Sequence, residues 1–443
     1  CLQGVATIRF ERGGAVVALD TRDLTILSVK TTGRSGEMPY DLSFHLSDPD
    51  PVLGQRLSVA LPHGVRTIQI EYQTSPEATG LQWDVERRFV YSQGESTNAR
   101  SYLPCQDSPG VRVTFEATIE VPEGLRGVMG ARHSSTAATA SLTRVDGWVM
   151  DKPIPAYLIA FAVGDLVQRR IGPRSYVWAA PSVIDVAAKE FEDVEDMIVA
   201  AEKLYGKYRW GEFNALVMPS SFPYGGMENP TLTFVSPSII AGDKSGVKVL
   251  IHELAHHWTG NLVTNATWPD FWLNEGATMY GQYRIMESLY GRDLTALDVH
   301  VFARNFDRAR DNWHAQGKSA LVCLRPDLTG QNPDDTFSLV PYHLGYLFFL
   351  ALERAVGRRR FDRFMRAYIR RFAFQSITTA QFLAFVRKEL PGVLETLDVE
   401  SWLHGNDVPA TAPKTVSKLA QRVEECLERG DALYEGASPG EIL

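Results

Sequence analysis

The chain has 443 residues, of which 44% are hydrophobic and 22% charged, and its formal net charge is −8. This length exceeds one ordinary hydrophobic core, so two or three domains are predicted, and the composition is typical of a globular protein. No basic domain stands out, which argues against a nucleic-acid partner. No apolar run reaches the roughly 18 residues that a membrane-spanning helix needs.

The cysteines are scattered and have no metal-ligand spacing; they are Cys1, Cys105, Cys323 and Cys426. This distribution favours free thiols in a reducing compartment, so a cytoplasmic location is predicted. A second interpretation is a lipoprotein processed to a lipidated Cys1. Trimming of a longer chain is preferred, because no Ser/Gly-rich tether follows Cys1.

Residues 1–178 are predicted to form a β domain. Short alternating stretches recur there between clusters of Gly, Pro, Asp and Asn, a pattern typical of a sandwich or an open, saddle-like sheet. The stretches are Val5–Phe10, Ala15–Leu19, Thr67–Tyr72, Val111–Val121 and Tyr157–Val167. Because the first stretch begins at once, the opening strands of the domain are expected to be missing.

Residues 179–405 are predicted to form a second domain, mostly helical with a small sheet. The apolar spacing indicates helices over Val186–Tyr208, Ser245–Thr259, a segment from about Phe271 to Tyr290, and Phe361–Phe372. Strands are expected at Ala215–Pro219 and Thr231–Val235. The arginines between 358 and 371 lie opposite an apolar stripe, so a solvated helix face is preferred over a nucleic-acid or membrane surface. A linker over His404–Lys414 opens a third region, 406–443.

The strongest chemical signal is the H-E-x-x-H pattern from His252 to His256. On a helix, positions i and i+4 share one face, so both imidazoles can reach one metal ion. A catalytic zinc site typically has three protein ligands and leaves a fourth position for water. Glu275 is the candidate third ligand, because eighteen residues separate it from His256 and it lies early in the next expected helix. Glu253 is the candidate general base.

A glycine-containing segment precedes the expected strand at Thr231–Val235. Gly225 and Gly226 would let a ligand backbone approach closely, and the neighbouring strand edge could accept an extended peptide. Glu228 would then suit a free α-amino group. An ordinary turn with an exposed glutamate would have the same sequence, so these residues alone leave both interpretations open.

Taken together, these motifs resemble the zinc aminopeptidase family of the gluzincin clan, which includes aminopeptidase N. Within that family the chain is most similar to the leukotriene hydrolase/aminopeptidase branch. The matching text is Pro219–Pro230, the H-E-x-x-H helix with its continuation, Trp272–Gly276 and Leu103–Asp107, and the resemblance runs from about residue 20 to 420. It implies one Zn²⁺ per chain in a thermolysin-like catalytic domain, and peptide substrates with a free amino terminus.

The resemblance also implies a role for individual residues. The implied zinc ligands are His252, His256 and Glu275, and Glu253 matches the general base. Glu228 matches the residue that binds the substrate's amino group, and Tyr342 matches the tyrosine that stabilises the tetrahedral intermediate. The remaining matches, which align the peptide or line its pocket, are Gly225, Gly226, Met227, Gln106, Tyr224 and Asp334.

Two departures from the family pattern limit the prediction. Phe337 stands where leukotriene hydrolases have a second pocket tyrosine, which weakens any inference of epoxide chemistry. The chain also ends at Leu443, so the family's C-terminal helical domain is expected to be largely absent. The leading hypothesis is a zinc aminopeptidase. The alternatives are a bifunctional lipid-epoxide hydrolase, for which Asp334 argues, and a non-catalytic peptide-binding relative.

Overall fold

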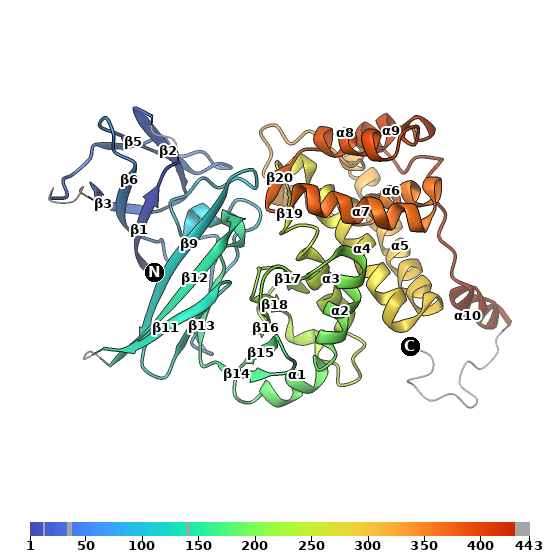
Figure 1. Ribbon diagram of the computed structural model, residues 1–443, viewed down its shortest axis with the longest axis horizontal. Coiled ribbons are helices and arrows are strands. Elements are labelled where there is room, and N and C mark those ends of the chain that lie inside the picture. The colour runs from blue at the N-terminus through green and yellow to red at the C-terminus, as the bar shows by residue number, and fades with distance from the viewer. Residues whose placement is uncertain (12–13, 33–37, 140–141, 430–443) are drawn as a thin grey trace. The chain divides into compact units, whose positions relative to one another are not determined.

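The chain folds into two compact units in a computed structural model that describes residues 1–11, 14–32, 38–139 and 142–429 (Figure 1). Unit 1 comprises Cys1–Asp165 together with Thr329–Asp335, and unit 2 comprises Leu166–Leu328 and the chain from Thr336 onward. The α+β class, with a β-rich N-terminal part followed by a mostly helical part, confirms the prediction. The domain limits 1–178, 179–405 and 406–443 stay predictions, and residues 430–443 lie outside the described part.

Unit 1 is built from antiparallel strands. Its sheets have the orders β1-β6-β3, β2-β5-β4, β10-β13-β8-β7 and β11-β12-β9. The strands are β1 Gln3–Arg9, β2 Val16–Thr21, β3 Thr25–Thr31, β4 Phe44–Leu46, β5 Gln55–Ala60, β6 Thr67–Gln73, β7 Leu81–Asp84, β8 Phe89–Ser92, β9 Arg112–Pro122, β10 Arg126–Met129, β11 Arg132–Ala138, β12 Thr143–Pro155 and β13 Phe161–Gly164. Every second residue of β5 and β6 enters one core, where Leu57, Val59, Ile68 and Ile70 are fully buried.

The strand predicted over Tyr157–Val167 is wrong. Residues 156–158 form a single 3-10 turn, and two short strands follow it. These strands, β13 (Phe161–Gly164) and β14 (Val167–Arg170), belong to different sheets. A continuous apolar run does not report a change of sheet, because its residues are buried on both sides of the break.

Unit 2 contains a five-stranded sheet of order β14-β15-β16-β18-β17. Its strands are β14 Val167–Arg170, β15 Ser175–Ala179, β16 Phe213–Val217, β17 Gly226–Met227 and β18 Thr233–Val235. The inner pairs β15/β16 and β16/β18 are parallel, whereas β14 and β17 run antiparallel at the two edges. The predicted small sheet is therefore confirmed, and β17 is an edge strand.

The helices of unit 2 surround α4, which is buried over most of its length. Helices α2, α3, α5 and α6 pack against it (Figure 1). The helices are α1 Ile184–Glu190, α2 Val194–Tyr205, α3 Val247–His256, α4 Trp272–Tyr290, α5 Arg292–Ala315, α6 Val340–Val356, α7 Arg358–Phe372, α8 Thr379–Glu389, α9 Val399–His404 and α10 Lys418–Arg429. Two short parallel strands, β19 (Val263–Asn265) and β20 (Gln375–Ile377), complete the unit.

The helix expected over Val186–Tyr208 is two helices, α1 and α2. The break lies at residues 191–193, where Phe191 is fully buried and Asp193 begins the second helix. Glu195 and Asp196 occupy the first turn of α2, where negative side chains favour the positive end of the helix dipole. The apolar spacing continues across this break, which is why periodicity alone merged the two helices.

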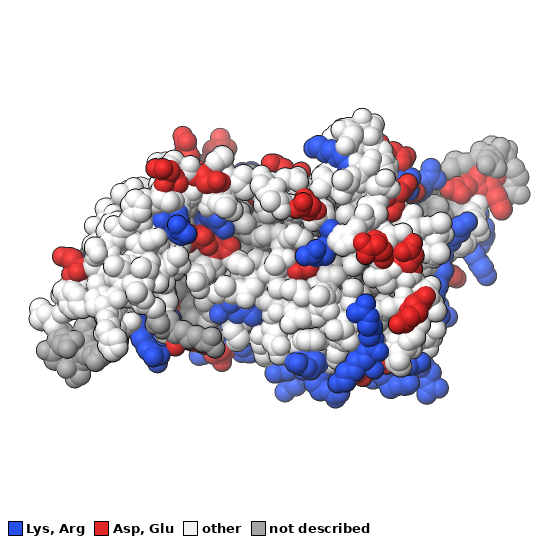
Figure 2. Space-filling view, turned by 90° about the horizontal axis from the view of Figure 1, so that it is seen from above, with Lys and Arg blue, Asp and Glu red and all other residues white. Residues whose placement is uncertain are grey.

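The arginine-rich helix α7 has the predicted two faces. Its buried side consists of Phe361, Phe364, Met365, Tyr368, Ile369 and Phe372. Most of its arginines are exposed, and Figure 2 shows basic side chains gathered along one edge of the surface. Among the described residues, no helix has the length and apolarity to cross a membrane.

Truncation of the buried face of α7 should destabilise unit 2. Phe364 is 3% exposed and stacks on Phe361, with Phe385 also in ring contact. We expect Phe364→Ala to lower the free energy of unfolding by about 3–5 kcal/mol, through lost burial and a cavity. The matched control Arg363→Ala, on the exposed side, should stay within about 0.5 kcal/mol. Denaturant unfolding of both variants measures this, and equal losses would contradict the packing described for α7.

Candidate metal centre and substrate site

Two consecutive helices supply the centre of the site. His252 and His256 lie one turn apart on α3, and the opposite side of α3 is apolar and fully buried. Because that apolar side packs against the unit, the histidine side is held against α4. Glu275 lies in the first turn of α4 and is 3% exposed.

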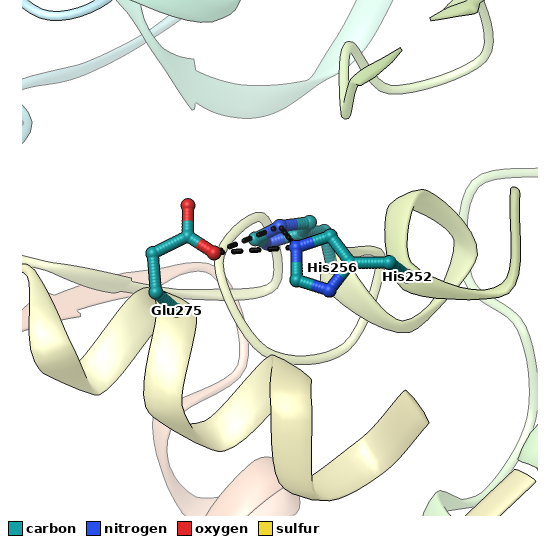
Figure 3. A group of neighbouring side chains, drawn as sticks. All are labelled: His252, His256 and Glu275. Atoms are coloured by element: carbon teal, nitrogen blue, oxygen red, sulfur yellow. Dashed lines mark hydrogen bonds and ion pairs between the residues drawn. The ribbon is translucent and has the colours of Figure 1, made fainter. Parts of the chain in front are cut away.

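The three side chains point toward one another, as Figure 3 shows. The Nε2 atoms of His252 and His256 are 3.0 Å apart. Oε2 of Glu275 lies 3.3 Å from Nε2 of His252 and 3.4 Å from Nε2 of His256. Ligand atoms about 2.0–2.1 Å from a tetrahedral zinc ion are separated by roughly 3.3–3.4 Å. The spacing of these three atoms therefore fits a zinc ion.

The second nitrogen of each imidazole faces a side chain of α4. Nδ1 of His252 lies 2.9 Å from Oε1 of Gln282, and Nδ1 of His256 lies 3.1 Å from Oγ1 of Thr278. The Thr278 hydroxyl donates its own proton to the carbonyl of Thr259, so its oxygen accepts from His256. In their neutral form both imidazoles are thereby assigned as Nδ1–H tautomers, which leaves a lone pair on each Nε2.

In this arrangement three hydrogen-bond acceptors face one another. Two Nε2 lone pairs and a carboxylate oxygen converge, and Oε2 of Glu275 is buried without a hydrogen-bond partner among the described residues. Buried polar atoms in proteins are nearly always paired, and three converging acceptors repel one another unless a cation lies between them. The chemistry of the donor set thus fits a metal ion with nitrogen and oxygen ligands.

Two further carboxylates border this centre. The ligand atoms of Glu228, Glu253 and His256 all lie within 4.8 Å of one another, and both glutamates are buried. Their looser spacing fits a zinc ion less well than the set of His252, His256 and Glu275. Oε1 of Glu228 has no hydrogen-bond partner in the described structure. A buried carboxylate with one unpaired oxygen, next to the candidate metal ligands, is suited to a cationic group of a ligand.

Gly226 leaves room for the Glu253 side chain. A Cβ atom at residue 226 would lie 2.4 Å from Oε1 of Glu253, so any larger residue would collide with the carboxylate. The predicted close approach at this glycine is therefore made, within the protein, by Glu253. Gly226 and Met227 form the edge strand β17, and Met227 is buried.

The electrostatics of the cluster favour a cation. Burial acts to lower the pKa of His256, but the carboxylates of Glu228 and Glu275 outweigh it and raise that pKa to about 10. Burial raises the pKa of Glu253, and His256 only partly opposes this effect. Burial likewise raises the pKa of Glu228. Three carboxylates around two imidazoles leave an excess of negative charge, which a divalent cation would neutralise.

Tyr342 reaches the same centre from the third residue of α6. Its ring lies against the imidazole of His252, with centroids 6.0 Å apart and planes inclined by 26°. A close helix crossing sets this position: a Cβ atom on Gly276 would lie only 2.5 Å from Cα of Gly345. The two glycines let α6 approach α4 closely at this crossing. Gly276 directly follows Glu275, and Gly345 lies about one helical turn after Tyr342.

His257 does not join the cluster, as expected from its angular offset. Its Nδ1 lies 2.8 Å from the Tyr208 hydroxyl, and its Nε2 lies 3.3 Å from Oγ1 of Thr233. Burial lowers its pKa to about 3, so the ring is neutral. This histidine links α3 to the sheet rather than to a metal.

The remaining predicted residues are distributed over both units. Gln106 and Asp334 belong to unit 1, where Gln106 is exposed. The Asp334 carboxylate accepts hydrogen bonds from the backbone and hydroxyl of Ser96, at 3.1 and 2.6 Å, and from the amide of Asn98, at 3.0 Å. Tyr224 is 50% exposed and its ring contacts Phe222. Their part in a substrate pocket stays a prediction.

Sequence reasoning missed three supporting residues. Thr278 and Gln282 lie three and seven positions after Glu275, on the face of α4 that meets the histidines. That spacing was a usable signal, since a metal-binding histidine usually donates its second N–H to a neighbouring acceptor. Asn261 donates from its amide to the Glu228 carbonyl at 2.7 Å and ties this loop to the end of α3. No spacing rule pointed to Asn261.

Comparison with known proteins identifies the family to which the chain belongs. The sequence profile of the "Peptidase family M1 domain" matches residues 190–404, and that of the "Peptidase M1 N-terminal domain" matches residues 1–158.

Three relatives illustrate the similarity. Leukotriene A-4 hydrolase of Xenopus laevis is 36% identical over 92% of this chain and 68% of its own length. Aminopeptidase B of Homo sapiens is 38% identical over 90% of this chain and 65% of its own. The structure of native yeast LTA4 hydrolase superposes with a TM-score of 0.89 at 34% identity, covering 96% of this chain and 68% of the other. The chain spans 62–68% of the length of the curated relatives it matches.

Removal of one ligand should abolish stoichiometric metal binding. We expect His256→Ala to lose zinc on dialysis against a weak chelator, because two ligands cannot hold the ion. The adjacent variant His257→Ala should retain zinc, although it removes a buried side chain. Metal content per chain, measured by elemental analysis after dialysis, distinguishes the two variants. Full zinc retention in His256→Ala would refute the ligand set.

Proposed function

Because the chain belongs to peptidase family M1, we propose that it is an aminopeptidase that removes single residues from the free amino terminus of short peptides. Family M1 comprises zinc metallopeptidases, and the cofactor of the chain is one zinc ion. The proposal that cleavage begins at a free amino terminus rests on one observation above all. This is the carboxylate of Glu228, which is buried beside the proposed metal ligands and whose Oε1 has no hydrogen-bond partner among the described residues.

His252, His256 and Glu275 are the proposed zinc ligands. Bound there, zinc would supply Lewis-acid activation of water and of the peptide carbonyl. The acceptors Gln282 and Thr278 hold the proton of each neutral imidazole on Nδ1, so both Nε2 atoms face the proposed zinc position. The site is therefore preorganised for the ion.

The substrate is proposed to bind as an extended peptide along β17, whose edge position suits β-addition. Its ammonium group would pair with Glu228. Since this carboxylate is already desolvated, it gains most from a cationic partner and least from a blocked, uncharged terminus. The pairing would place the first peptide bond at the metal centre and limit cleavage to one residue.

Glu253 is the proposed general base. It would take the proton from the attacking water and pass it to the leaving amine, and its raised pKa suits both transfers. Tyr342, beside His252, would donate its hydroxyl hydrogen to the oxygen that becomes negative in the transition state. Gly226 allows Glu253 to stand close to the peptide-binding strand.

Blocking the amino terminus tests the use of Glu228. We expect release of the first residue from short peptides to fall by at least about a hundredfold when the α-amino group is acetylated, because the ion pair is lost. Glu228→Gln should lower kcat/KM for the free peptide and narrow the difference between free and acetylated peptides. Both are measured by chromatography of released residues. Equal cleavage of the two peptides by the unmodified enzyme would refute the proposal.

Substitutions at Glu253 and Tyr342 test the chemical step. Glu253→Gln should retain zinc but lose about 10²–10⁴-fold in kcat, since the amide cannot accept the proton. Tyr342→Phe should lower kcat by about 10²–10³-fold with little change in KM, because only the transition-state hydrogen bond is removed. Arg363→Ala, an exposed substitution on α7, serves as the control. Near-normal turnover in Glu253→Gln would contradict its role.

Peptide hydrolysis is preferred over lipid-epoxide hydrolysis. The alternative depended on Asp334, whose carboxylate oxygens already accept hydrogen bonds from Ser96 and Asn98. Phe337 contacts the ring of Phe271 and has no hydroxyl to offer an epoxide. Glu228, in contrast, offers an unpaired charge that suits a peptide amino terminus.

A further inference from the structure

A neutral amide stands behind one of the candidate zinc ligands. Gln282 is 6% exposed, and its Oε1 lies 2.9 Å from Nδ1 of His252. Its Nε2 faces the thioether sulfur of Met286 at 3.7 Å, a weak acceptor. The amide orientation follows from this environment, because only Oε1 can accept the His252 proton while Nε2 keeps a partner of its own.

We propose that Gln282 is a positioning residue that tunes zinc affinity through its neutral charge, an inference that rests on the zinc site of the proposed function. It holds His252 in the Nδ1–H tautomer and fixes the orientation of the ring. A neutral amide accepts the Nδ1–H hydrogen bond less strongly than a carboxylate would. The imidazole ring therefore carries less electron density, and Nε2 is a weaker electron-pair donor to zinc. It therefore keeps the affinity for zinc below what the same geometry would give with a glutamate.

The absence of charge on Gln282 matters because its surroundings are already negatively charged. Glu228, Glu253 and Glu275 already place three buried carboxylates around the two imidazoles. A fourth charge at position 282 would strengthen the attraction for a divalent cation across a poorly screened interior. Thr278 is likewise an uncharged acceptor for His256, so neither ligand imidazole has a charged acceptor at its Nδ1.

Zinc affinity measured without substrate tests this inference. The apo protein is titrated with zinc in competition with a chromophoric chelator at constant pH. Gln282→Leu keeps a side chain of similar volume but cannot accept the hydrogen bond from His252. We expect it to raise the apparent Kd for zinc by about 10–100-fold. Gln282→Glu should keep the hydrogen bond to His252 and add a negative charge. We expect its Kd for zinc to be about tenfold lower than that of the unmodified chain.

Met286→Leu is the matched control on the same helix. It removes the sulfur contact to Gln282 but not the hydrogen bond to His252, so its Kd should stay within about threefold of the original. An unchanged Kd in Gln282→Leu would overturn the inference, as would equal weakening in Met286→Leu. If Gln282→Leu does not fold, the nearly isosteric Gln282→Glu variant tests the inference. An unchanged or higher Kd for zinc in that variant would overturn the proposed role of the neutral amide.

The two proposals fail separately. Zinc titration involves no peptide, so a negative result here leaves the aminopeptidase assignment intact. Equal cleavage of free and acetylated peptides would refute the exopeptidase proposal without altering the expected order of the zinc affinities.

Discussion

The structure depends on one electrostatic constraint, the convergence of three electron-pair donors in a buried space. Nε2 of His252, Nε2 of His256 and Oε2 of Glu275 lie 3.0–3.4 Å apart, and neutral imidazoles present only lone pairs to one another and to the carboxylate there. Such a cluster is unfavourable without a cation and favourable with one. Helices α3 and α4 must therefore be held together by something other than these side chains. The apolar side of α3 and the buried length of α4 provide that packing.

Close backbone contacts complete the site around this constraint. At Gly276 and Gly345 the absence of side chains lets α6 approach α4, which brings Tyr342 to the imidazole of His252. At Gly226 the same absence lets the edge strand β17 approach Glu253. In both places the geometry of the candidate site requires a residue without a side chain, because an added methyl group would collide with the neighbouring helix or with Glu253.

The three carboxylates of the candidate site differ in pKa because their environments differ. Glu275 faces both ligand imidazoles, and although burial opposes it, His256 and His252 lower its pKa. Glu253 and Glu228 are also buried, and burial outweighs the attraction of the imidazoles for their charge, so their pKa values are raised. This separation matches the proposed division into a ligand, a proton acceptor and an amino-group binder.

The sequence by itself determined the elements whose signals are local. H-E-x-x-H with Glu275 predicted three side chains that the structure brings together, because helical spacing places His252 and His256 on one face, and the alternating stretches predicted a β-rich first part. The start of α4 after Phe271 and the buried face of α7 were also predicted correctly. These features depend on neighbours within a few residues along the chain.

Tertiary structure alone decided the rest. The acceptor at each imidazole, Gln282 or Thr278, lies more than twenty residues from its histidine, and the contact forms only because α4 packs on α3. The break between α1 and α2 and the change of sheet after β13 were missed, because buried residues resume directly after each break, at Val194 and at Leu166. Asp334 was predicted as a pocket residue, yet which donors its carboxylate meets was settled by the folding of a distant segment beside it. Contacts between distant segments carry no spacing that a single sequence can reveal.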